Sequence, residues 1–149
     1  MRIEDEIHQK KFKSVWQKAT LNIIFTAGWI SNRHKDYFKP YGITPQQFNV
    51  LRILRGSHPE SISTSVIKER MLDKNSDASR IVDRLTVKGL VKKRACPSDR
   101  RLVDVSISDE GLKLLEVMDE PMDKMDGKLG ALTEAEADLL NQLLDKLRS

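Results

Sequence analysis

The chain has a single cysteine, Cys96, among its 149 residues. This excludes an internal disulfide framework, and a lone thiol fits a reducing cytoplasm. Long apolar runs are also missing, since no stretch approaches the roughly 20 residues that a membrane span needs. The opening segment MRIEDEIHQKKF lacks the apolar core of a secretory signal. We therefore expect a cytoplasmic protein that does not enter the membrane.

The sequence also lacks the motifs of common enzyme and metal sites. Its three histidines, His8, His34 and His58, are scattered, without the paired Cys, His or Glu spacing of a zinc site. There is no P-loop, no Ser–His–Asp pattern and no glycine-rich phosphate cradle. We therefore expect no enzymatic activity, no metal and no cofactor.

The composition is that of one globular domain, with 39% hydrophobic and 32% charged residues. The charge is unevenly distributed. Residues 62–105 hold eleven Lys and Arg against six Asp and Glu, a balance of +5, whereas residues 109–149 hold five against eleven, a balance of −6. A basic middle favours contact with phosphate, although solvated charges on helix surfaces would also explain the imbalance.

Helical patterns occupy most of the chain. Residues 4–37 predict one long helix, which Pro40 and Gly42 end. Thr44-Pro45-Gln46-Gln47 is a capping box with proline at the first helical position, so a second helix should start there.

Shorter helices should follow. Ser63 can cap a helix through about Arg70, and Asn75 or Ser76 can cap the next. The last two helices are expected at about 109–128, where Pro121 should cause a kink or a restart, and at 134–148, where Thr133 and Glu136 form a second capping box.

The most informative stretch is residues 74–107. Its first part predicts an amphipathic helix that buries Ala78, Ile81, Val82 and Leu85 and ends at Gly89. Two strands, 91–95 and 103–107, should then form a hairpin around the turn 97–100. A helix that exposes hydroxyls and arginines, followed by a basic hairpin, suits a DNA major groove and the neighbouring backbone or minor groove.

This order of helices and hairpin is the winged helix-turn-helix arrangement. Three segments, GITPQQFNVLRIL (42–54), SRIVDRLTVKGLV (79–91) and DRR (99–101), resemble the multiple-antibiotic-resistance regulator (MarR) family. The resemblance covers nearly the whole chain. It implies a mainly α fold with a small β-hairpin wing, and a homodimeric bacterial transcription factor, usually a repressor, that binds a pseudo-palindromic operator. The implied layout is one domain, with dimerisation helices at about 4–37 and 109–149 and the winged lobe at about 44–107.

The resemblance also implies roles for single residues. Ser79 and Arg80 would reach base edges and phosphates in the major groove. Asp99 and Arg101 match the Asp-x-Arg signature of the wing, where Asp99 would hold the guanidinium or the turn. Arg101, with Arg100 as a second contact, would enter the minor groove. The expected DNA-contacting residues are Ser76, Ser79, Arg80, Arg84, Lys92, Lys93, Arg94, Asp99, Arg100 and Arg101.

Some of these residues have a plainer alternative. Ser76 could serve only as a helix cap, Asp99 could only form an Asx-turn, and Arg84 could pair with Asp83 or Glu69. Lys92, Lys93 and Arg94 are expected to attract phosphate without reading sequence.

The terminal helices are expected to form the dimer. Methionine and leucine recur along 112–129 and 132–147. These apolar side chains are more numerous than a lobe of this size needs for its own core, so contact with a second chain is expected. A monomeric helical subdomain is the alternative.

The resemblance further implies a small aromatic or phenolic effector that binds where the dimer helices meet the lobe. Its expected contacts, which could equally be packing and surface residues, are Trp29, Arg33, His34, Tyr37 and Phe38.

Two rival functions remain. Nearby arginines could lower the pKa of Cys96 and make the protein a thiol-based redox sensor. Alternatively, the winged lobe could bind a protein instead of DNA.

Overall fold

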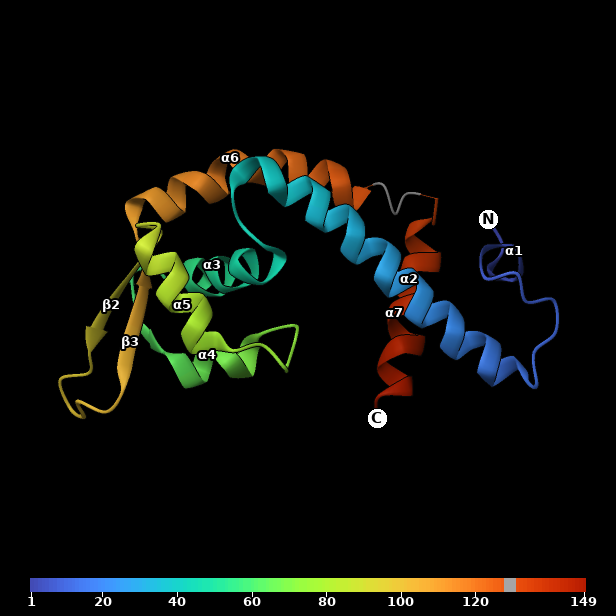
Figure 1. Cartoon of the computed structure of the whole chain (residues 1–149), viewed down its shortest axis with the longest axis horizontal. Helices are drawn as coiled ribbons and strands as arrows, with labels where there is room; N and C mark the ends of the chain where they lie inside the picture. Colours follow the sequence, from blue (N-terminus) through green and yellow to red (C-terminus); the bar gives the residue numbers. More distant parts are fainter. Residues whose placement is uncertain (128–130) are drawn as a thin grey trace.

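The computed structural model describes residues 1–127 and 131–149. The elements are α1 (Ile3–Glu6), α2 (Val15–Phe38), the 3₁₀ turn η1 (Lys39–Tyr41), α3 (Pro45–Ser57), β1 (Ile62–Ser63), α4 (Thr64–Arg70), α5 (Ala78–Val87), β2 (Val91–Ala95), β3 (Val103–Ile107), α6 (Asp109–Asp126) and α7 (Glu134–Leu147). The segment from α3 to β3 forms a lobe, and both termini lie to the right of this lobe in the view (Figure 1). The predicted mainly α fold with a hairpin wing is confirmed.

The sheet is antiparallel, with strand order β1-β3-β2. In the hairpin, Val91 pairs with Ile107 and Ala95 pairs with Val103, as the alternating pattern predicts. The third strand, β1, places Ile62 opposite Val105. Sequence analysis missed β1 because two residues are too few to show an alternating pattern.

A single apolar core holds the lobe and joins it to α2 and α6. Its fully buried members include Phe38 from α2, Leu51 and Leu54 from α3, Leu85 from α5, Val105 from β3, and Leu115 and Met118 from α6. Each such side chain contributes on the order of 1.5–3 kcal/mol by leaving water. The surface helix α5 therefore rests on a rigid support.

Local caps start the helices where the sequence predicts them in three cases. Thr44 and Gln47 form the capping box of α3, Ser63 caps α4, and Thr133 and Glu136 form the capping box of α7. The predicted cap of α5 is wrong. Neither Asn75 nor Ser76 but Asp77 caps this helix, and its Oδ1 accepts a hydrogen bond from the Arg80 N–H at 3.1 Å.

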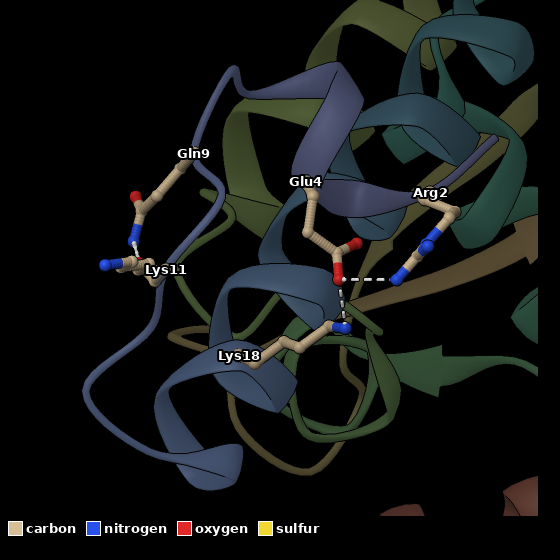
Figure 2. A network of polar contacts seen from close by, with 5 residues as sticks. All are labelled: Arg2, Glu4, Gln9, Lys11 and Lys18. Atoms are coloured by element: carbon tan, nitrogen blue, oxygen red, sulfur yellow. Dashed lines mark hydrogen bonds and ion pairs between the residues drawn. The ribbon is translucent and has the colours of Figure 1, made fainter.

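The expected single helix over 4–37 is also wrong, because the chain forms α1, an irregular segment, and then α2. His8 has a positive φ of 52°, and Ser14 caps α2 by accepting a hydrogen bond from the Gln17 N–H at 3.1 Å. We refer to residues 1–14 as the N-terminal arm. Figure 2 shows the Glu4 carboxylate of this arm between the Lys18 ammonium, at 2.5 Å, and the Arg2 guanidinium, at 3.2 Å. With Ile3 buried as well, these contacts hold the arm on α2 and favour the break over a continuous helix.

Helix α6 contains Pro121 and continues through it, so the predicted restart does not occur. The alternative effect of this proline, a kink, stays a prediction. The predicted end near residue 128, and the expected apolar position Leu129, lie outside the described residues. None of the helices in the described ranges has both the length and the apolar character of a membrane span.

Candidate nucleic-acid interface

Helix α5 has one buried and one exposed face. Ala78, Val82 and Leu85 are buried against the lobe, which confirms the predicted orientation. The opposite face exposes Ser79, Arg80 and Arg84. Among the described residues, the side chains of Arg80 and Arg84 form no hydrogen bond and no ion pair. Their guanidinium groups are therefore available to acceptors outside the chain, such as phosphate oxygens and guanine edges.

The end of α5 connects the helix rigidly to the hairpin. Gly89 adopts a left-handed φ of 72°, as predicted. Its N–H donates to the Thr86 carbonyl and the Leu90 N–H donates to the Leu85 carbonyl, both at 3.0 Å, which forms a Schellman motif. Strand β2 begins at Val91, two residues after Gly89, so the orientation of α5 determines where the hairpin starts.

Sequence analysis expected Ser76 to point outward and contact DNA, but the residue is buried. Its side chain is 8% exposed, and its buried Oγ has no hydrogen-bond partner in the described part of the chain. Asp77 takes the capping position, and the Ser76 hydroxyl before it is buried. A hydroxyl in this position is poorly placed to contact DNA.

The tip of the hairpin is organised by Asp99. Its Oδ1 accepts a hydrogen bond from the Arg101 N–H at 3.0 Å and lies 3.4 Å from Arg101 Nε. Both interpretations of Asp99 are thus present together, because the carboxylate forms the Asx-turn and also holds the guanidinium. The Arg101 side chain remains 92% exposed, and Arg100 beside it is exposed as well. The tip presents two cations to solvent.

The basic residues of β2 lie on two faces of the strand. Lys92 and Arg94 point away from the core, whereas Lys93 shares the face of the buried Val91. Lys93 Nζ lies 2.6 Å from Asp83 Oδ1 and so joins β2 to α5. Asp83 therefore pairs with Lys93, and the suggested pairing with Arg84 does not form. Lys93 has a structural partner, whereas Lys92 and Arg94 have no ion-pair partner in the described ranges 1–127 and 131–149.

Helix α5 lies between the hairpin and α4 (Figure 1). Two grooves flank this helix. One, of about 310 Å³, is lined by Arg80 and Arg84. The other, of about 390 Å³, lies between α4 and the start of α5 and is lined by Thr64, Ser65 and Lys68. Sequence analysis missed these three residues, although two hydroxyls and a lysine at one helix are a usable signal for phosphate contact.

Cys96 lies at the base of the hairpin turn and is partly exposed. Its Sγ is 3.1 Å from Ser98 Oγ. Hydrogen bonds from the Ser98 side chain and from the backbone of Ser98 and Asp99 lower the pKa of the thiol. Ser98 and the turn, not the neighbouring arginines, are thus the cause.

Among the described residues, the five expected effector residues are distributed over more than one cavity or packing contact. The Arg33 guanidinium stacks 4.5 Å from the centre of the Trp29 ring, and Trp29 lines a small cavity of about 210 Å³ beside the N-terminal arm. The Tyr37 hydroxyl donates to the Met118 carbonyl at 3.1 Å, and burial raises the pKa of this tyrosine. Only His34 and Phe38 line a larger groove, of about 380 Å³, between α2, α3, α6 and the segment after α4.

Comparison with known proteins agrees with this geometry. A sequence model described as the MarR family matches residues 41–102. The HTH-type transcriptional repressor MdtR of Bacillus subtilis is 40% identical over 96 residues, which are 64% of this chain and 61% of MdtR.

Two crystal structures extend the comparison over most of the chain. A MarR transcription factor from Planctomyces limnophilus has 34% sequence identity and a TM-score of 0.70, over 93% of this chain and 98% of that one. A cysteine-to-serine mutant of Escherichia coli MarR, complexed with operator DNA, has 27% identity and a TM-score of 0.73, over 85% and 91% of the two chains.

A relative of 34% identity is thus matched along almost its whole length, and the fold and the winged helix-turn-helix elements agree with it. The chain belongs to the MarR family of DNA-binding transcriptional regulators, which are not enzymes.

Proposed function

We propose that the protein is a transcriptional repressor that binds a pseudo-palindromic operator as a homodimer. The observation that carries this proposal is the common exposure of Arg80 and Arg84 on α5 and of Arg101 at the tip of the adjoining hairpin. An exposed helix with two free arginines fits the major groove, and the hairpin tip fits the minor groove beside it.

The dimer proposal rests on two unburied apolar faces. Helix α2 exposes Val15, Trp16, Ile23, Ile24 and Trp29, and α7 exposes Leu139, Leu140, Leu143 and Leu147. Isolated exposed apolar residues are common, but rows of them along two helices indicate a protein contact. A second copy would bury both rows and present two α5 helices to half-sites about one turn of DNA apart.

A salt series with selected genomic DNA fragments tests the DNA-binding mode. We expect tight, sequence-selective binding that weakens steeply with salt, since phosphate contacts release counterions. Arg80→Ala should lose selectivity, by about 1–3 kcal/mol for a bidentate base contact. Arg148→Ala changes the net charge equally at the chain's far end and should leave selectivity intact. Weak binding that is equal for all fragments and indifferent to Arg80 would contradict the proposal.

Redox sensing is a second candidate, favoured by the hydrogen bond between Cys96 and Ser98 and the lowered pKa of the thiol. A larger thiolate fraction reacts faster with peroxides. If the protein senses oxidants, Cys96→Ser should abolish peroxide-induced DNA release while keeping DNA affinity. Identical peroxide responses in the two proteins would exclude this candidate.

A further inference from the structure

Helix α6 is attached to the DNA-binding lobe at two separate places, and the first is the start of the helix. Ser108 Oγ donates to the Gly89 carbonyl at 2.6 Å and accepts the Gly111 N–H at 3.1 Å. A β-carbon at Gly111 would lie 2.3 Å from the Leu90 carbonyl oxygen, so α6 packs directly on the backbone that follows α5. The start of α6 and the end of α5 therefore form one close junction.

The second attachment is an ion pair farther along α6. Arg55 of α3 donates two hydrogen bonds to the Asp119 carboxylate, from Nη1 to Oδ2 at 2.9 Å and from Nη2 to Oδ1 at 3.0 Å. Two parallel hydrogen bonds between planar groups fix an orientation as well as a distance. On the preceding residue of α6, the Met118 carbonyl accepts the Tyr37 hydroxyl of α2. Adjacent residues of α6 thus hold α2 and α3.

Together the two attachments determine the angle between α6 and the lobe. About 16 Å of helix separates Ser108 from Asp119. A rigid helix that is held at two such points cannot swing, whereas one that is held only at its start can pivot there. The buried Leu115 and Met118 side chains lie between the two points, but apolar contacts are not directional. In the described part of the chain, Arg55–Asp119 is the single ion pair between the lobe and α6.

We propose that the Arg55–Asp119 pair orients the lobe on α6 and thereby determines which half-site spacing the protein accepts. The spacing preference rests on the proposed function, in which the terminal helices join two copies. The angle between α6 and the lobe then sets the separation and relative rotation of the two α5 helices. One extra base pair moves the half-sites apart by about 3.4 Å and turns them by about 35°. A fixed lobe should reject this change, and a swinging lobe should follow it.

A spacer series tests the preference. Anisotropy would compare the selected operator with versions that have one base pair more or fewer between the half-sites. We expect the wild type to lose about tenfold or more in affinity for each altered spacer, because one lobe misses its base contacts. Asp119→Ala and Arg55→Met should lose less than about threefold, because the lobe can then move as on a hinge. If the pair only supported folding, both variants would bind all three operators more weakly by the same factor.

Two further variants control this experiment. The exchange of both partners, Arg55→Asp with Asp119→Arg, should restore the spacing preference of the wild type. Glu120→Ala removes the neighbouring exposed carboxylate, which pairs with Lys124 inside α6, and should keep that preference. A spacing preference that is unchanged in Asp119→Ala and Arg55→Met would overturn the proposal.

A measurement without DNA separates the ion pair from the proposed function. Spin labels at Glu69→Cys on α4 and Asp123→Cys on α6 occupy exposed positions. In a Cys96→Ser protein diluted with unlabelled chains, double electron–electron resonance measures the distance between them. We expect a narrow distance distribution that Asp119→Ala broadens, and an unchanged distribution would overturn the proposal. If the distribution broadens but the wild type binds no operator, the repressor proposal is contradicted and the orienting role of the pair is supported.

Discussion

At the start of α5, Asp77 takes the capping role that the sequence predicts for Asn75 or Ser76. All three are typical capping residues, and each stands near the position where the apolar period begins. The Asp77 carboxylate accepts the Arg80 N–H, while the Ser76 hydroxyl is buried without a partner among the described residues. A side chain's position relative to the first helical turn, and not its type, decides which of two adjacent candidates caps a helix.

We predict that Asp77→Ala lowers the free energy of unfolding by about 1 kcal/mol, because one orphan N–H of α5 loses its acceptor. Ser76→Ala should cost nothing measurable, since it removes a buried hydroxyl that makes no hydrogen bond. Urea denaturation of both variants measures the two effects. A larger loss for Ser76→Ala than for Asp77→Ala would show that the serine is the cap.

At the scale of elements, α5 is attached to its neighbours near its C-terminal end. Asp83 pairs with Lys93 of β2 at 2.6 Å. The Lys88 ammonium donates to the Gly42 carbonyl and, at 3.2 Å, to Gln47 Oε1, which also accepts the Thr44 N–H. Lys88 thereby joins the end of α5 to the turn between α2 and α3 and helps to hold α5 in place.

We therefore predict that Lys88→Met weakens operator binding several-fold and lowers the free energy of unfolding by about 1 kcal/mol. Because Lys88 positions α5 and does not neutralise phosphate, the slope of log affinity against log salt should stay unchanged. Lys88→Arg should restore part of the affinity. A slope reduced by about 1 would instead identify Lys88 as a direct phosphate contact.

The N-terminal arm is also held on its neighbour by charged groups, because Glu4 of the arm pairs with Lys18 of α2. The Lys18 ammonium, with the backbone N–H of Glu4 itself, lowers the pKa of the Glu4 carboxyl from its usual 4.5 to about 2 (Figure 2). A lowered carboxyl pKa means that the charged form is favoured in the folded arm. Its stabilisation is thus complete above about pH 4.5 and is lost as the pH falls through about 2.

Hydrogen exchange of residues 1–7 should follow this pH dependence. After correction for intrinsic exchange rates, we expect protection at pH 5 to exceed protection at pH 2.5 in the wild type. Glu4→Gln should be less protected at pH 5 and should lose the pH dependence. Equal protection of both proteins at pH 5 would show that the buried Ile3 side chain alone holds the arm.

At the scale of the whole molecule, the exposed apolar faces of α2 and α7 are the main unexplained surface of the single chain. Trp16 is 78% exposed and Leu143 is 55% exposed, values that are costly for side chains of this size in water. The proposed homodimer would remove this cost and would also supply the two lobes that a pseudo-palindromic operator requires.

We predict that Leu143→Glu converts the dimer to a monomer in analytical ultracentrifugation. Operator affinity should then fall on the order of 100-fold, because the second lobe no longer binds at a high effective concentration. Asn141→Glu places the same charge on another face of α7 and should leave the dimer intact. A wild type that sediments as a monomer, or a dimeric Leu143→Glu variant, would contradict this assignment.

Much of the fold follows from local sequence signals. The capping boxes at Thr44 and Thr133, the left-handed Gly89 and the alternation of Val103, Val105 and Ile107 were all predicted and are confirmed. Each depends on contacts within a few residues. The break before α2 was missed because apolar residues continue across it, and the arm's attachment depends on a pair fourteen residues apart, Glu4 and Lys18.

The sequence by itself determined the family, the order of helices and hairpin, and the exposed face of α5, because capping, periodicity and turn chemistry act over short distances. Only the tertiary structure decided that Ser76 is buried, that Asp83 binds Lys93, and that, among the described residues, Trp29 lines one cavity while His34 and Phe38 line another. Each of these three features depends on which distant segments of the chain pack against one another. The packing of the whole core decides which segments meet, and no local sequence pattern encodes that outcome.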